Sequence, residues 1–434
     1  MGERGSAAPP PTSVTPGSAT PERRTELDAI RVLVVAGLVF FHSALVFDAR
    51  DDYYVKNAET TEVTMYLAGV AVLWAMPMLF LVSGVGARYS LRRRGAGGFA
   101  AERLRRLGVP LLFATFVLLP LPQWLRRLGE GGRESYPEFL PLFFDVHLDL
   151  AEFPFVVRGE YFESGHLWFV VLLLAFSLLL APLVRWFPRG AARRGRELLA
   201  AAVRAPGMVL VLPAIPLALV SALHGMEEGF AAWSRWAYLL FFLYGYALAA
   251  DARLREAMRR DAAWAVAATL VLFGAGMPIF LVVGETTGAD PFTAMLPAAI
   301  GARAMYGAAG WCCLVAILGL LDRRRARKTA AAAPPASSPD APGPFAGSPA
   351  APGRAGGRAR RAYAYLAAAA LPVYILHQPA VVAVAYPVVR WPAPIPVKYL
   401  VIVVVAGALT LAAYDLLVRR TQLTRFLFGM RPPR

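Results

Sequence analysis

The sequence predicts an all-α protein, a polytopic membrane helix bundle of about ten transmembrane helices. The first observation behind this prediction is composition: 57% of the 434 residues are hydrophobic, and the mean hydropathy is +0.50. The second is that the apolar residues gather in stretches of roughly 20, the length of a helix that crosses a bilayer. The third is that short basic segments separate these stretches. A soluble protein of this length would show more polar helix faces.

Ten apolar stretches are candidate spans. They cover about 27–47, 63–87, 107–125, 166–187, 207–223, 236–250, 262–283, 296–321, 363–389 and 396–418. The sixth stretch is short, and Pro120 and Pro122 interrupt the third, so nine or eleven spans also fit. Packed membrane helices tolerate the Pro and Gly residues that some stretches contain.

The basic residues predict the orientation. With ten spans and the N-terminus inside, 33 of the 45 Lys and Arg residues lie in the inside segments and eight in the outside loops. This asymmetry follows the positive-inside rule, so we expect a multi-pass protein of the cell (inner) membrane with both termini cytoplasmic. The same rule accounts for the net charge of +16, and we therefore expect the lipid bilayer as a partner and no nucleic acid.

Two segments fall outside the expected membrane domain. Residues 1–24 are rich in Pro, Ser, Thr and Gly and predict a disordered cytoplasmic tail. Residues 322–361 are Pro-, Ala- and Gly-rich between basic clusters and predict a flexible cytoplasmic linker. The membrane domain then comprises residues 25–321, with the first eight spans, and 362–434, with the last two.

The first span carries three groups that lipid does not tolerate: Asp28, Arg31 and His42. Charged side chains within a span usually face a protein interior or a wet cavity and indicate function. Arg31 and His42 are separated by about 1100° of helix rotation and a rise of about 16 Å, so they share a face. Asp28 lies three residues before Arg31, a spacing of surface neighbours. We expect a polar track that enters the membrane from the N-terminal side.

Other candidates are less specific. Arg103 and Arg106 are three apart before the third span and suit the phosphates of an anionic ligand, although positive-inside topology also explains them. His166 and Trp168 open the fourth span, where they are either interfacial anchors or part of a site. His377 lies in the ninth span and is either a satisfied buried histidine or a substrate contact. No histidine pair has metal-ligand spacing, so we predict no metal.

The outer loop 126–165 is acidic and aromatic. A loop of this size either helps to build a substrate site or simply covers the bundle, and the residues alone favour neither. Ser83-Gly84, at the end of the second span, allows close helix packing.

These motifs resemble the acyltransferase 3 family of integral-membrane acyltransferases. The resemblance rests on Asp28-x-x-Arg31 followed after ten residues by His42. Further matching stretches, in the family's order, are MPMLFLVSG (76–84), ERLRRLGVPLLF (102–113), HLWFVVLLL (166–174) and YILHQPAVV (374–382). Three further features are similar to the branch of this family that succinylates periplasmic glucans. They are FHSALVF followed by VKNAE (55–59), LPLPQW (119–124) and LTRFLFGMRP (423–432).

The resemblance implies an acyltransferase that uses acyl-coenzyme A as cytoplasmic donor substrate, with no bound cofactor, and an extracytoplasmic glycan hydroxyl as acceptor. His42 would act as general base or carry the acyl group itself. Asp28 and Arg31 would order each other and bind donor phosphate. The residues that would contact the substrates are Arg103, Arg106, His166, Trp168 and His377. For a succinyl group, Arg303 is a candidate cation, and its alternative role is to pack against a carboxylate such as Asp415.

Two alternatives remain at this stage. Family members also acylate peptidoglycan, lipopolysaccharide, capsule and secondary metabolites, so the acceptor is open, as is the choice between succinyl and acetyl. A transporter for a glycan or an anion would also explain many spans, intramembrane charge and a basic inner face.

Overall fold

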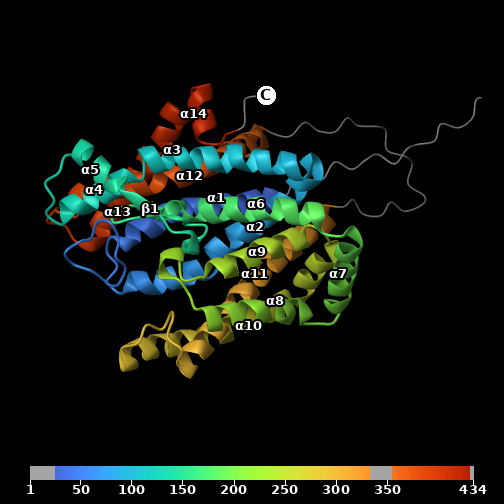
Figure 1. Cartoon of the computed structure of the whole chain (residues 1–434). Coiled ribbons are helices and arrows are strands. Elements are labelled where there is room, and N and C mark those ends of the chain that lie inside the picture. Colours follow the sequence, from blue (N-terminus) through green and yellow to red (C-terminus); the bar gives the residue numbers. More distant parts are fainter. Residues whose placement is uncertain (1–24, 333–353, 431–434) are drawn as a thin grey trace, which may run out of the picture.

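The computed structural model describes residues 25–332 and 354–430. Fourteen α-helices in these ranges form a bundle whose long members run in the same general direction (Figure 1). In chain order the α-helices are α1 (Thr25–Leu45), α2 (Val63–Arg103), α3 (Val109–Val117), α4 (Pro120–Gly129), α5 (Tyr136–Phe143), α6 (Trp168–Trp186), α7 (Arg189–Ala202), α8 (Met208–Leu219), α9 (Arg235–Leu248), α10 (Ala252–Thr287), α11 (Pro297–Ala332), α12 (Arg354–Val388), α13 (Ile395–Ala413) and α14 (Gln422–Leu427).

Short elements complete the chain. β1 (Val146–Leu148) and β2 (Val157–Gly159) form a small antiparallel hairpin in the predicted outer loop. Single π-helical turns follow α2, α8 and α13, at Leu104–Gly108, Val220–His224 and Tyr414–Val418. Single 3₁₀ turns occupy Leu150–Glu152, Gly165–Leu167 and Glu228–Phe230.

The prediction of an all-α membrane bundle is confirmed. Seven helical segments of the described ranges are long and apolar enough to cross a membrane, and one of them, Leu67–Gly129, contains the second and third expected spans. Met208–His224 is a shorter apolar helix at the fifth expected span, and α9, at the sixth, has 14 residues. Each of the ten expected stretches therefore coincides with helix, and the protein is a multi-pass membrane protein.

Helices extend further than the expected span edges. α2 continues to Arg103 through the segment expected as a basic loop, and it bends at Gly95, whose φ of 68° a residue with a side chain rarely adopts. α11 and α12 extend into the predicted linker, which is helical over 322–332 and 354–361. The remainder of that linker, 333–353, and the predicted tail, 1–24, lie outside the described residues.

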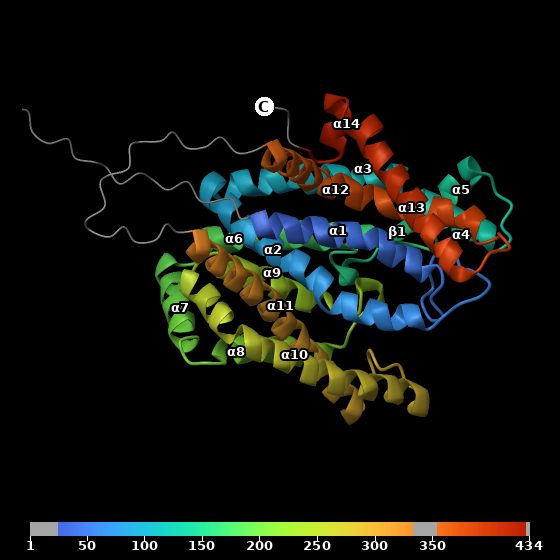
Figure 2. The same cartoon turned by 180° about the vertical axis from the view of Figure 1, so that it is seen from behind.

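α1 contacts α2, α12 and α13 (Figure 2). Its first residues are at the end of the bundle that holds α7, and its last residues are near α4 and α5 (Figures 1 and 2). We call these the α7 end and the α4 end. The positive-inside rule predicts that the α7 end is cytoplasmic.

A cluster of aromatic rings forms the core between α2, α6 and α9. Phe80 packs on Phe169 and Tyr238, with ring centroids 4.7 and 4.5 Å apart, and all three are buried. Such offset and edge contacts stabilise ring pairs beyond area burial. The core therefore fixes α6, which begins at Trp168 directly after the turn that carries His166.

A buried arginine of α11 holds two neighbouring segments of the chain in place. The fully buried Arg303 donates hydrogen bonds to the carbonyl oxygens of Ser221, Ala222, Pro291 and Ala294. Asp415 instead bonds to Arg419 and Tyr365. The expected pairing of Arg303 with Asp415 is therefore wrong, and the backbone carbonyls that already occupy the guanidinium group argue against the expected succinyl contact.

Candidate active site

Three histidines from distant parts of the chain meet at the α4 end of α1. The ring centroid of His377 lies 5.0 Å from that of His42 and 5.2 Å from that of His166. α1 supplies His42, the turn before α6 supplies His166, and α12 supplies His377. Nothing in their separation along the sequence predicts this cluster, because it depends on how α12 packs against α1 and α6.

Backbone carbonyls orient two of these rings. His166 Nε2 lies 3.0 Å from the Ile375 oxygen, and His377 Nδ1 lies 2.6 Å from the Tyr374 oxygen. A carbonyl accepts only from a protonated ring nitrogen, so a neutral His377 leaves Nε2 unprotonated. That nitrogen is buried and, like His42 Nδ1, has no hydrogen-bond partner among the described residues. The cluster therefore retains unused capacity to bind a proton.

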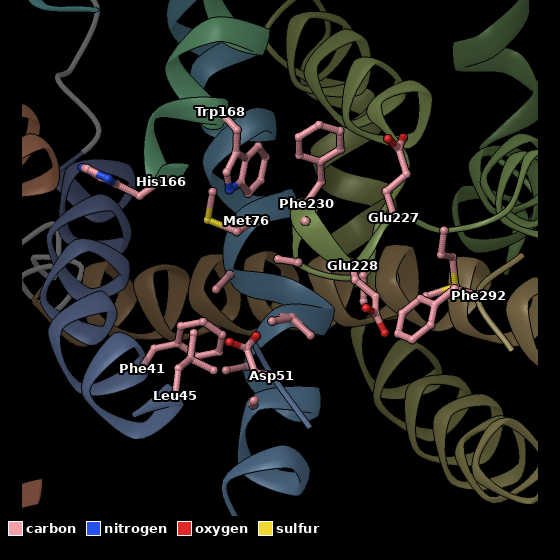
Figure 3. Close-up of a pocket in the computed structure, with 18 of the residues that line it drawn as sticks. Phe41, Leu45, Asp51, Met76, His166, Trp168, Glu227, Glu228, Phe230 and Phe292 are labelled. Carbon is pink, nitrogen blue, oxygen red and sulfur yellow. The ribbon is translucent and has the colours of Figure 1, made fainter. Parts of the chain in front are cut away.

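A cavity of about 1630 Å³ adjoins this cluster (Figure 3). His42, His166 and Trp168 line it, while His377 lies behind them. Along α1 its wall runs from Leu33 to Leu45, a rise of about 18 Å. It therefore extends from the α4 end to about one turn from Arg31. Cavities of this size hold small molecules and cofactors.

Part of the predicted outer loop forms the cavity wall. Glu152, Phe155, Phe162 and Glu163 line the cavity together with His166. Of the two interpretations of loop 126–165, the described geometry favours a contribution to the site.

The other charged candidates lie towards the α7 end. Arg31 Nη1 is 3.4 Å from Asp28 Oδ1, the pairing that the spacing predicts, and Nη2 donates to the Val82 oxygen at 3.1 Å. Neither Asp28 nor Arg31 lines the large cavity. About a third of the Arg31 side chain, 36%, stays exposed, so it can still meet a ligand.

Arg103 and Arg106 lie near Arg31. The three guanidinium groups are close enough to repel one another electrostatically. Arg106 also contacts Glu102 at 3.4 Å and donates to the Gly429 oxygen at 3.3 Å, and Arg103 stacks over the Phe99 ring. Three arginines beside two carboxylates, Asp28 and Glu102, leave excess positive charge, which suits an anionic ligand.

Comparison with family models shows to which family the chain belongs. Residues 24–419 match the acyltransferase 3 family model, described as an acyltransferase domain. The chain belongs to the acyltransferase 3 family. A search of curated proteins found no match, and a search of solved structures found none. The matched range takes in α1 to α13, so this family member is a membrane acyltransferase over almost its whole length.

Four further cavity residues of this acyltransferase were missed in the sequence: Asp51, Tyr53, Glu228 and Gln378. The run DARDDYY after the first span is an acidic and aromatic signal that could have indicated the first two. Tyr53 is 5% exposed and stacks on His42 with ring centroids 5.9 Å apart. Its hydroxyl and the Gln378 Oε1 atom have no hydrogen-bond partner among the described residues.

The loop that carries Asp51 and Tyr53 is tied down by hydrogen bonds. Lys56 donates to the carbonyl oxygens of Leu45, Asp48 and Asp51, and the buried Lys398 donates to Asn57 at 2.8 Å. Surrounding protein displaces water from Asp51 and raises its pKa to about 6, against the opposing charge of Lys56. Burial likewise raises the pKa of the Tyr53 hydroxyl, with Asp51 adding to the effect.

Proposed function

We propose that this protein transfers an acyl group, succinyl or acetyl, from acyl-coenzyme A to a hydroxyl of an extracytoplasmic glycan. The supporting observation is that His42 lines a large cavity that extends along α1 towards Arg31. The basic cluster at the α7 end then meets a cytoplasmic donor, and the α4 end meets the acceptor. The cell membrane, with both termini cytoplasmic, is the location that this proposal requires.

The chemistry follows from the placement of His42. The acceptor hydroxyl oxygen attacks the thioester carbon, and His42 takes the hydroxyl proton. The carbon–sulfur bond then breaks, and the thiolate leaves with a proton returned by the imidazolium. His377, which lies beside His42, acts as a positioning residue that keeps the His42 ring in place. In the alternative mechanism a ring nitrogen of His42 attacks the thioester carbon, the carbon–sulfur bond breaks and coenzyme A leaves. The acceptor hydroxyl then attacks the acyl-histidine, the carbon–nitrogen bond breaks, and the imidazole leaves with the hydroxyl proton.

Arg31, Arg103 and Arg106 are proposed to bind the phosphates of coenzyme A. Charge-assisted contacts of guanidinium groups with phosphate are short and strong. Asp28 orients Arg31, because the two side chains are paired. His166 and Trp168, in the cavity wall, are proposed acceptor contacts.

The choice of a glucan as acceptor is the most specific part of the proposal. It rests on the likeness of FHSALVF, VKNAE, LPLPQW and LTRFLFGMRP to glucans biosynthesis protein C, the succinyltransferase of periplasmic glucans.

A donor assay tests the proposal: purified protein in detergent receives radiolabelled acetyl- or succinyl-coenzyme A with a periplasmic glycan fraction. Label in the glycan supports it. Absence of label with both donors contradicts it, and flux of glycan across liposomes without donor would support a transporter.

The donor site gives a separate prediction. Arg31→Ala should raise the KM for acyl-coenzyme A by roughly 10- to 100-fold, because a hydrogen bond to a charged group contributes about 1.5–3 kcal/mol. Steady-state rates at varied donor concentration measure this effect. Arg193→Ala, which removes an exposed arginine of α7, is the control and should leave the KM unchanged. A drop in kcat with an unchanged KM would place Arg31 outside the donor site.

A further inference from the structure

We propose that the mouth of the cavity is a subsite for an ammonium group, and that the acceptor is a sugar carrying a protonated amine. This inference rests on the proposed acyl transfer to a glycan hydroxyl, and it replaces the neutral glucan proposed above with an amino sugar as the acceptor. It places the amine between Asp51 and Glu228, with an acylated hydroxyl of the same sugar reaching towards Tyr53 and His42.

The charge of the cavity wall is the first argument. Nine carboxylate residues line the cavity, against three arginines. The carboxylates are Asp48, Asp51, Asp52, Glu152, Glu163, Glu227, Glu228, Glu285 and Asp290, and the arginines are Arg50, Arg158 and Arg235. Such a wall repels anions and raises the local concentration of cations.

Most of these carboxylates are already engaged. Glu152 and Glu227 bind Arg235, Asp52 binds Arg126, and Glu285 lies 3.8 Å from Arg50. Glu163 accepts from Tyr54, and Asp48 and Asp290 accept from nearby backbone and threonine groups. Among the described residues, the carboxylates of Asp51 and Glu228 have no hydrogen bond or ion pair.

Asp51 and Glu228 face the same space from two parts of the chain. Asp51 belongs to the loop after α1, and Glu228 to the turn before α9 (Figure 3). They are close enough for the charge of Glu228 to act on Asp51. Two unpaired carboxylates near each other repel, and a cation between them removes that repulsion.

The surroundings favour an organic cation. Phe41, Phe230 and Phe292 line the same part of the cavity, and Phe292 lies beside Glu228 (Figure 3). Aromatic faces attract ammonium groups. In the described ranges no group of three or more His, Cys, Asp or Glu residues could hold a metal ion, so the two carboxylates suit an amine better than a metal.

Buried polar groups give an independent indication of a ligand. Tyr53 and Gln378 line this cavity, are 5% and 4% exposed, and each has a polar atom without a partner in the described ranges. Buried polar groups are rarely left without a partner. Tyr53 lies within electrostatic range of Asp51 and stacks on His42, so a sugar bound to Asp51 by its amine would extend towards the reacting imidazole.

Binding of two matched trisaccharides tests the subsite. The probes are a glucosamine trisaccharide with free amines and its fully N-acetylated, neutral counterpart, titrated into the purified full-length protein at pH 7. We expect the amine form to bind at least ~10-fold more tightly, since an ammonium–carboxylate contact is charge-assisted. Asp51→Asn/Glu228→Gln should abolish this preference.

A second double variant controls for the loss of negative charge from the cavity. Asp52→Asn/Glu285→Gln removes the same charge from the same cavity, but from carboxylates that arginines already engage. This variant should retain the preference for the amine form of the trisaccharide. Equal binding of the two probes by the unmodified protein would overturn the proposal. So would a preference that survives Asp51→Asn/Glu228→Gln, or one that is lost equally in the control.

The pH dependence provides a further prediction. Because the pKa of Asp51 is raised to about 6, its carboxylate is charged above that pH and neutral below it. The preference for the amine should therefore fall as pH decreases from 7 through 6 to 5. The probe amines gain protons over the same range, so a fall in the preference reports the loss of the carboxylate charge. The charged groups that act on Asp51 are Lys56, Asp48 and Asp52 of its own loop and Glu228 across the cavity. A preference that is constant between pH 7 and 5 would contradict the role of Asp51.

The subsite and the proposed function can fail separately. If the amine preference is present but no acyl group is transferred to any acceptor, the subsite stands and the acyl transfer proposal fails. If acyl transfer occurs with equal kcat/KM on amino and N-acetylated sugars, the transfer proposal stands and the subsite fails.

Discussion

His42→Ala is expected to abolish acyl transfer while the protein still inserts and folds. Removal of a general base typically costs about 10²- to 10⁴-fold in rate. His42 lines the cavity, and its Nδ1 has no hydrogen-bond partner in the described ranges, so its loss breaks no such contact there. Transfer of radiolabel from acyl-coenzyme A to acceptor measures the effect.

The control is His147→Ala, which removes an exposed histidine of β1 that does not line the cavity. It should retain full activity. Added imidazole should partly restore transfer to His42→Ala, because the vacated space opens to the cavity. Full activity in His42→Ala would remove His42 from the mechanism.

The same pair of proteins separates the two mechanisms. Incubation with labelled acyl-coenzyme A and no acceptor leaves protein-bound label only where an acyl-histidine forms. Label on the unmodified protein that is absent from His42→Ala would indicate the covalent route. No label on either protein, with transfer intact in the unmodified one, would indicate the general base.

The sequence predicted the helices well because hydropathy and charge are local properties. The fold class and the positions of all ten stretches follow from apolar runs near 20 residues and from the basic segments between them. The Asp28–Arg31 pair was also predictable, since three residues on one helix are neighbours. The Gly95 bend and the helical extensions past the expected edges were not, because the end of an apolar run marks where a helix leaves the bilayer and not where the helix ends.

The site was predictable only in part. Each of His42, His166 and His377 could be chosen from its setting, but their meeting depends on packing between helices more than 100 residues apart. Asp51 and Tyr53 lie in a loop whose conformation is set by Lys56 and by Lys398 of α13, which no local pattern indicates. The role of Arg303 was also not predictable, because its carbonyl partners Ser221 and Ala222 lie more than 80 residues away in the sequence and no local pattern marks Pro291 and Ala294 as acceptors.

The second large effect is expected from the contact between α2 and α9. Gly84 and Gly245 lie where the two backbones touch, in agreement with the close packing expected from Ser83-Gly84. A Cβ atom at Gly84 would lie 1.9 Å from the Phe242 oxygen, and one at Gly245 would lie 1.8 Å from the Leu81 oxygen. Small residues permit this approach in membrane bundles.

Gly245→Ala should therefore lower the free energy of unfolding by about 3 kcal/mol or more, because backbone atoms on both helices must separate. Thermal unfolding in detergent, followed by the fluorescence of the buried tryptophans, measures the loss. The control is Gly407→Ala in α13, where no atom lies within 4 Å of the new Cβ. It should be neutral or stabilising by up to ~1 kcal/mol, since alanine favours helix over glycine.

A separation of α2 from α9 also has a consequence for the site. The Val82 oxygen that accepts from Arg31 lies one residue from Leu81, and Met76 of the same helix lines the cavity. A shift of α2 would therefore move both the proposed donor contact and the cavity wall. Gly245→Ala should reduce transfer even below its melting temperature, whereas Gly407→Ala should not. An unchanged melting temperature in Gly245→Ala would contradict the close contact between the α2 and α9 backbones.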